Sequence, residues 1–251
     1  MKIVSLVYIS TVLVAASITG CVVQKPVADK AAVSDTIRIP GTGNQLALEV
    51  SFSKGEAHNH PSFAIWIEDM NENYIQTLFI TRSVGTGIYG HGRLDNERWD
   101  NKPGPQKRPA SLPYWLHKRS SFFGVPLLPD SAHPVTDGYT GATPSGDFVI
   151  KTGIKQGLPG KFRILMEINQ PWDWNEFWTN SLYNDLDYRT SCQPSLIYAV
   201  TIDQKNPGTV RFLNPVGHGH YSGKDGNLYT DLTTFTTALE ILDKATVTLI
   251  K

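Results

Sequence analysis

Cysteine is nearly missing from this sequence, because Cys21 and Cys192 are the only two among its 251 residues. Small secreted domains stapled by disulfides carry several cysteine pairs, so that class of protein is excluded. The length suffices for one large all-β domain with its own apolar core. A lone cysteine inside an exported domain is most often a small buried residue, so Cys192 is not a candidate reactive site.

The sequence also lacks an excess of charge of either sign. It contains 23 lysines and arginines against 23 aspartates and glutamates. A surface that binds nucleic acid needs a basic excess or a basic stripe, and neither occurs here. We therefore expect no nucleic-acid partner.

Three common catalytic motifs are absent as well. The chain has no Gly-x-Ser-x-Gly elbow, no phosphate-binding Gly-Lys-Ser/Thr loop and no His-Glu-x-x-His pair. The usual sequence support for a serine hydrolase, a nucleotide-dependent enzyme or a zinc peptidase is therefore missing. These absences favour a protein without catalysis of its own.

The chain begins with an export signal. Residues 1–20 combine a positive charge at Lys2, an apolar run and small residues near the end. Ile18-Thr19-Gly20-Cys21 resembles the bacterial lipobox, which implies that residues 1–20 are removed and that Cys21 carries lipid. The residue after Cys21 is valine and not aspartate, which favours the outer membrane in the enteric pattern. An uncleaved anchor helix is the alternative, since the apolar run is about as long as a short membrane span.

The segment behind the cysteine is polar and rich in alanine. Residues 21–36 hold few large apolar side chains, so they are expected to form a flexible tether between the lipid and a folded domain. The predicted domain covers residues 37–251.

Alternating apolar residues predict many short strands in that domain. The clearest signal is a hairpin over residues 61–82, in which Phe63, Ile65 and Ile67 share one face. Further strands are expected at residues 46–53, 148–150, 161–168, 197–202, 210–213, 230–241 and 246–250. In the strand at residues 161–168, alternation predicts that Arg163, Leu165 and Glu167 point outward. Residues 85–113 read as a long loop, and residues 112–122 as a short helical turn. The pattern predicts an all-β fold, an antiparallel immunoglobulin-like β-sandwich with long loops.

Several sequence blocks resemble an exported bacterial family known as domain of unknown function 2271. They are residues 61–69, 74–80, 108–115, 137–144 and 159–162 leading into Glu167. The resemblance runs in order from the first strand to the end of the chain. It implies an immunoglobulin-like sandwich outside the cytoplasm and no established activity.

One motif resembles a modification site. Asp137-Gly138-Tyr139-Thr140-Gly141-Ala142-Thr143 is similar to the sequence at which a periplasmic transferase attaches FMN through a phosphoester. The resemblance implies covalent FMN on Thr143 and an electron-transfer role beside an envelope redox partner. Small residues at Gly141 and Ala142 would let the flavin phosphate approach the backbone. The alternative is a loop between two strands, in which Asp137 and Thr140 bind local backbone donors.

Two His-x-His pairs form a second candidate site. They are His58 with His60, and His218 with His220. In an extended strand, residues two apart point the same way, so each pair could offer two imidazoles to Zn²⁺ or Cu²⁺. Both pairs also adjoin turn residues, where histidines are commonly just solvated.

A third candidate is a cluster of aromatic residues flanked by polar ones. It contains Trp172, Trp174, Phe177, Trp178 and Tyr183. Such a platform could stack a sugar or another planar ligand, with Trp172, Trp174 and Trp178 as the main rings. The alternative is that the cluster covers one open end of the sandwich, with tryptophan N–H groups hydrogen-bonded at its rim.

These observations lead to one main hypothesis and two alternatives. The main one is a lipid-anchored binding or accessory module of the cell envelope with an assembly partner and no catalysis. The alternatives are an FMN carrier that uses Thr143 and a periplasmic metal binder that uses the histidine pairs.

Overall fold

The computed structural model describes residues 35–39, 46–95 and 98–250. The chain divides into two units, Met1–Ala32 and Val33–Lys251, and all described residues belong to the second. The predicted signal peptide and Cys21 lie outside the described residues. Strand β1 begins at Asp35, so the folded part starts two residues before the predicted boundary at residue 37.

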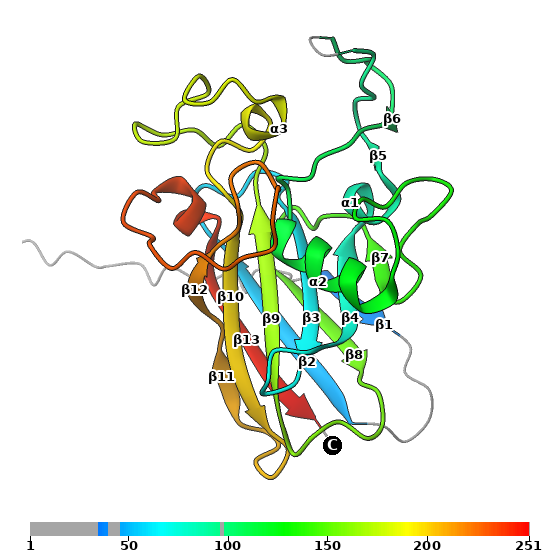
Figure 1. Cartoon of the computed structure of the whole chain (residues 1–251). Helices are drawn as coiled ribbons and strands as arrows, with labels where there is room; N and C mark the ends of the chain where they lie inside the picture. The colour runs from blue at the N-terminus through cyan, green and yellow to red at the C-terminus, as the bar shows by residue number, and fades with distance from the viewer. Residues whose placement is uncertain (1–34, 40–45, 96–97, 251) are drawn as a thin grey trace, which may run out of the picture. The chain divides into compact units, whose positions relative to one another are not determined.

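Five strands form one sheet, and six form a second sheet that faces it (Figure 1). The five-stranded sheet has the order β1 (Asp35–Ile39), β8 (Phe148–Gly153), β2 (Ala47–Lys54), β13 (Leu242–Ile250), β11 (Val210–Phe212). The six-stranded sheet has the order β12 (Asn214–His218), β10 (Leu196–Asp203), β9 (Lys161–Asn169), β3 (Ser62–Glu68), β4 (Tyr74–Thr81), β7 (Tyr139–Gly141).

Most neighbouring strands are antiparallel, but the sheets are mixed. The hairpin predicted over residues 61–82 is confirmed, with Ala64 opposite Ile80 in an antiparallel pair. Two pairs at the sheet edges are parallel, namely β1 with β8 and β4 with β7. The expectation of purely antiparallel sheets was therefore wrong at these edges. Both exceptions involve strands that long connections separate in sequence, and such connections permit either direction.

The main core lies between the two sheets. Alternate residues of β2, Leu48, Val50 and Phe52, face it and are buried. Their partners from the other sheet include Phe63 and Ile65 of β3. Stacked aromatic rings connect the two sheets, since the ring centroids of Phe63 and of Phe148 in β8 lie 5.4 Å apart. The period of two in the sequence correctly identified these inward faces.

The outer face of the six-stranded sheet is buried too. Helix α2 (Pro113–Phe123) lies across this face in Figure 1. A second apolar cluster beneath it includes Ala64, Trp66, Trp115 and Leu165. Leu165 and Glu167 were expected to point outward to solvent, but both are fully buried because the helix covers them.

The remaining elements are short. They are α1 (Arg82–Thr86), β5 (Ile88–Tyr89), β6 (Gly104–Pro105), α3 (Leu186–Arg189) and the 3₁₀ helix η1 (Thr237–Glu240). Strands β5 and β6 pair with each other within the predicted long loop. None of the helices in the described residues is long and apolar enough to cross a membrane.

Candidate functional site

The covered face of the six-stranded sheet holds an unusual buried carboxylate, Glu167 of β9. Its oxygens accept hydrogen bonds from the backbone N–H groups of Tyr114, at 3.1 Å, and of Trp115, at 2.7 Å. The Ser195 hydroxyl donates to it at 2.5 Å. These N–H groups belong to the first turn of α2 and have no partner within the helix, so Glu167 caps the helix from the sheet. Burial nevertheless raises the pKa of Glu167 to about 7, although these donors oppose the shift.

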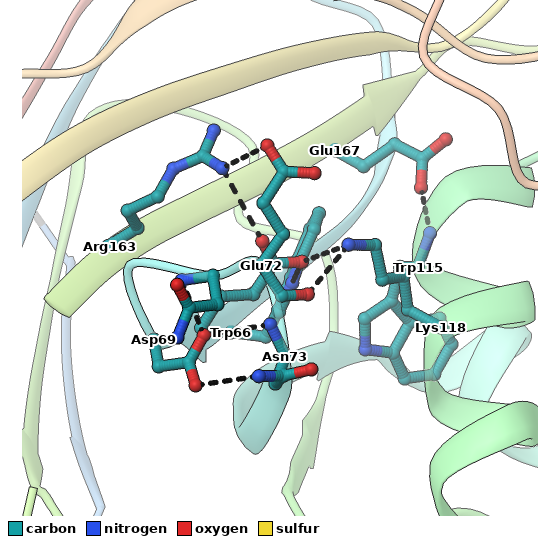
Figure 2. A network of polar contacts seen from close by, with 10 residues as sticks. Trp66, Asp69, Glu72, Asn73, Trp115, Lys118, Arg163 and Glu167 are labelled. Atoms are coloured by element: carbon teal, nitrogen blue, oxygen red, sulfur yellow. Dashed lines mark hydrogen bonds and ion pairs between the residues drawn. The ribbon is translucent and has the colours of Figure 1, made fainter.

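A second buried carboxylate, Glu68, lies at the end of β3. Its Oε1 accepts a hydrogen bond from the Trp66 indole at 2.9 Å and lies 3.3 Å from the Lys118 ammonium. The Arg163 guanidinium lies 3.7 Å from Oε2 and 3.0 Å from a carboxylate oxygen of exposed Glu72. Figure 2 shows Arg163 and Lys118 on either side of Glu72. Burial raises the pKa of Glu68, and the Trp66 and Lys118 contacts partly offset the shift.

The motif that resembles an FMN attachment site, residues 137–143, contacts the same helix. Asp137 forms an ion pair with Arg119 of α2 at 2.6 Å and accepts a hydrogen bond from the Tyr74 hydroxyl at 2.7 Å. Its partners are therefore distant side chains and not the local backbone donors expected for a loop. Residues Tyr139–Gly141 form edge strand β7, which corrects the loop interpretation for this part.

Close packing explains both glycines of this motif. A Cβ at Gly138 would lie 2.5 Å from the Thr77 side chain, and one at Gly141 would lie 2.7 Å from the Phe79 ring. Thr140 pairs with Ile80 of β4, and Ala142 is exposed.

The hydroxyl of Thr143 is already engaged. It donates a hydrogen bond to the carbonyl oxygen of Pro61 at 2.9 Å, and the side chain is half-buried. A phosphoester at this oxygen would remove the donated proton and this bond. The motif thus has a structural role in the described fold, while its modification by FMN stays a prediction.

The first histidine pair contacts backbone groups. Both ring nitrogens of His58 lie 3.2 Å from carbonyl oxygens, those of Ile241 and Pro144. Exposed His60 places Nδ1 3.0 Å from the Asn59 side-chain oxygen. The two imidazoles therefore take separate partners near the end of β2.

The second pair packs among aromatic rings. His218 lies 5.3 Å from the Tyr229 ring, and His220 lies 4.5 Å from the Tyr221 ring. Burial lowers the pKa of His218. Within the described ranges, no three His, Cys, Asp or Glu side chains gather as metal ligands. The metal hypothesis gains no support from this geometry and stays a prediction.

The predicted aromatic cluster and the second histidine pair meet at one end of the fold. Trp178 lies 5.8 Å from Phe235 and 6.4 Å from His218, between ring centroids. Its indole N–H donates to the Thr234 hydroxyl at 3.0 Å. Next to it, Tyr183 stacks on Tyr221 at 4.0 Å. We call this region the aromatic end. It consists of residues 171–195, His218, His220, Tyr221, Tyr229, Phe235 and the half-buried Trp99.

Three large rings of the aromatic end point into solvent. Trp172 is 45% exposed, Trp174 54% and Phe177 47%. Trp172 also meets Trp99 edge to face at 5.7 Å. Trp178 differs from the other two predicted platform residues, because it is half-buried and packs against the main core. Of the three predicted platform residues, Trp178 thus supports the loop from inside, while Trp172 and Trp174 form the exposed surface.

A dense hydrogen-bond network supports the exposed rings. The Asn175 side-chain oxygen accepts the N–H groups of Phe177 and Trp178 at 2.9 and 2.7 Å. Its amide nitrogen donates to Gln193 and to the Thr234 carbonyl oxygen at 3.1 and 2.8 Å. These bonds tie the aromatic loop to the chain that precedes η1, so the rings are presented from a fixed support.

Asp173 lies on the inner side of the same loop. It is nine-tenths buried, and its carboxylate accepts a hydrogen bond from the Thr237 hydroxyl. Burial raises its pKa. Its other oxygen has no hydrogen-bond partner among the residues that the structure describes. Neighbouring Cys192 is fully buried, and burial raises its thiol pKa to about 11, which fits the expectation of an unreactive cysteine.

Sequence reasoning missed the partners that complete this site. Trp99, Tyr221, Phe235 and Thr237 reach the aromatic end from three separate loops. Aromatic character is the only signal that could have suggested a role for Trp99, Tyr221 and Phe235, and Thr237 carries no such signal. No local spacing links these residues to Trp172.

The fold and site together define a two-sheet, mostly β protein with a polar, helix-covered sheet face and exposed aromatic rings at one end. No protein-family model, curated protein or solved structure matches the chain.

Proposed function

We propose that this protein is a binding module of the bacterial cell envelope that has no catalytic activity and holds its ligand at the aromatic end. One observation carries the proposal: three exposed aromatic side chains stand on a loop fixed by hydrogen bonds. Exposed apolar rings contribute little to folding, and grouped rings of this kind typically mark a binding surface.

The polar groups beneath α2 are poorly suited to catalysis. Glu167 is fully buried, and its close partners are three hydrogen-bond donors that also fix the helix. Glu68 is likewise fully buried. A general acid or base needs to reach its substrate, so these carboxylates are better explained as supports of the fold.

The cellular location of the protein forms part of the same proposal. Its support is the sequence of residues 1–20, the lipobox-like residues ending at Cys21 and the tether behind them. The proposed location is the periplasmic side of the envelope, with the outer membrane favoured. Resemblance to the domain of unknown function 2271 family and to an immunoglobulin-like sandwich agrees with this location.

Retention by the cell envelope tests the proposal. The full chain, purified from membranes in detergent, is mixed in the same detergent with envelope fragments from a strain that lacks the gene, and the bound fraction is measured by sedimentation. Lipid is first extracted from these fragments, because the acyl chain proposed at Cys21 would otherwise insert into their bilayer. We expect Trp172→Ala and Trp174→Ala to lower retention. Phe122→Ala is a matched control, because Phe122 is 54% exposed on α2, away from the aromatic loop. Equal retention of all four proteins would overturn the proposal.

Lipidation is tested separately in the same strain. We expect labelled fatty acid to enter the full chain and to be lost in Cys21→Ser. A chain that has lost its signal peptide but carries no labelled fatty acid would refute the lipid anchor. The retention experiment would then still test the binding surface.

A further inference from the structure

We propose that the aromatic end binds neutral glycan chains, by stacking sugar rings on Trp172 and Trp174. This inference rests on the proposed function, since it names the class of ligand for the same surface. Its evidence is the exposure of the rings, the charge around them and the rigidity of their support.

The two tryptophans lie at the surface of one loop. Trp172 and Trp174 are exposed, while Asp173 between them is buried and Asn175 after them is half-buried. Trp172 has a left-handed backbone with a φ of 62° in a turn, and Asp173 forms a strand-like bridge with Cys192. The buried Asp173 thus anchors the loop, and the exposed rings on either side of it can each stack on a sugar unit.

The local charge selects against anionic ligands. Residues 171–195 contain three acids that reach the surface, Glu176, Asp185 and Asp187, and one base, Arg189. Their fourth acid, Asp173, is buried behind the rings. Nucleic-acid strands that stack on aromatic side chains also need a basic groove for their phosphates. An acidic loop lacks that groove, and it repels sulfated glycans and acidic headgroups. Neutral sugars remain, because their C–H faces are apolar and their hydroxyls bind polar side chains.

The arrangement also differs from an aromatic cage for a cation. A cage surrounds an ammonium group with ring faces. Here the neighbouring ring, Trp99, meets Trp172 edge to face at 5.7 Å, so these two rings fill the space between them. The exposed surface is a platform, which fits the flat face of a pyranose ring.

The supporting network prepares the platform for binding. Asn175 and Gln193 fix the loop by hydrogen bonds to residues 234–237, and the Thr237 hydroxyl binds Asp173. A surface held in its binding geometry avoids the entropy cost of ordering side chains around a ligand. The structure therefore presents the rings without a required rearrangement.

Selective chemical treatment of the envelope tests the ligand class. Envelope fragments are digested with protease, and one half is then oxidised with periodate, which cleaves vicinal diols of sugars. The other half receives periodate that was first quenched with a diol. Retention of the full chain and of the Trp172→Ala, Trp174→Ala and Phe122→Ala variants is measured at low and high salt.

We expect the wild-type chain and Phe122→Ala to be retained on protease-treated fragments at both salt concentrations. Each tryptophan variant should bind about tenfold more weakly, which corresponds to about 1.4 kcal/mol of lost stacking on one ring. Active periodate should abolish retention, while quenched periodate should not. High salt should have little effect, because a neutral ligand makes no screened ion pairs.

Four outcomes would overturn the inference. Tryptophan-dependent retention that protease removes would keep the proposed function and assign a protein ligand. Retention that survives periodate would keep the proposed function and exclude a glycan with free vicinal diols as the ligand. Retention lost in high salt would assign a charged ligand, again within the proposed function. An absence of any tryptophan-dependent retention, before or after treatment, would defeat the proposed function itself.

Discussion

Two regions of this protein combine aromatic rings with carboxylates, yet they use them in opposite ways. Beneath α2, Glu68 and Glu167 are fully buried among donors that join the helix to the sheet. At the aromatic end, Trp172 and Trp174 face solvent, and the polar side chains lie behind them. Composition alone therefore does not separate a structural network from a binding surface. The direction of the apolar groups does.

The largest effect is expected beneath α2. Glu167→Ala removes the cap of the helix and leaves two N–H groups and the Ser195 hydroxyl without their acceptor. We expect the free energy of unfolding to fall by about 4 kcal/mol, because a cavity forms and buried donors lose their partner. Urea unfolding measures the change. A loss below about 1 kcal/mol would show that Glu167 does not join the helix to the sheet.

The pH dependence of stability sharpens the role of the same carboxylate. Its pKa in the folded state is raised to about 7 from the ordinary value of 4.5. The stability that protonated Glu167 contributes is therefore fully present below about pH 4.5 and is lost as the pH rises to about 7, by up to about 3 kcal/mol.

Glu167→Gln supplies the control, because glutamine has nearly the same shape and no charge. From pH 5 to pH 8, the unfolding free energy of the wild-type protein should fall relative to that of the variant, because glutamine does not ionise. Parallel curves over that range would contradict a raised pKa.

At the aromatic end, the supporting ring should matter more for stability than the exposed ones. Trp178 packs against the main core and donates to Thr234. We expect Trp178→Ala to lower the unfolding free energy by about 3 kcal/mol, as is typical when a largely buried aromatic ring is removed. Thermal unfolding followed by circular dichroism measures it. A change as small as that of a surface substitution would remove the distinction between support and platform.

A smaller effect is expected at Thr143. Thr143→Ala removes the hydrogen bond to the Pro61 carbonyl oxygen, which should cost about 1 kcal/mol. Intact mass after co-expression with an FMN transferase tests the modification in the same proteins. A gain of one FMN in the wild-type chain alone would assign Thr143 to the flavin and remove the purely structural interpretation of the motif.

Local pattern predicted the long strands of both sheets, but the strand expected at residues 230–241 was wrong, because this segment forms turns and the 3₁₀ helix η1. The short edge strands β1, β7 and β12 were missed. Alternation identified β2 and the inward face of β3, because a strand buried on one side repeats every two residues. It did not predict what covers the other face. Leu165 and Glu167 read as outward residues, and only the packing of a helix some fifty residues earlier in the chain buries them.

The candidate site was predicted in pieces. Trp172, Trp178 and His218 were identified one by one from residue type. The contacts of Trp178 with His218 and of Trp172 with Trp99 join loops that are distant in sequence. For Asp137, the expectation of local backbone donors was wrong, because its partners are Arg119 and Tyr74 beneath α2, while FMN at Thr143 stays a prediction. Neither long-range pairing has a signature in local spacing.

The smallest effect on stability should occur at the residues we regard as most important for function. Trp172→Ala and Trp174→Ala should change the unfolding free energy by less than about 0.5 kcal/mol, because exposed rings gain little from folding. Urea unfolding of both variants beside Trp178→Ala measures this. A loss above about 2 kcal/mol in either would mean that the ring supports the loop, and weaker envelope retention by that variant would then report unfolding. Unchanged stability together with lost retention separates binding from folding at this end of the molecule.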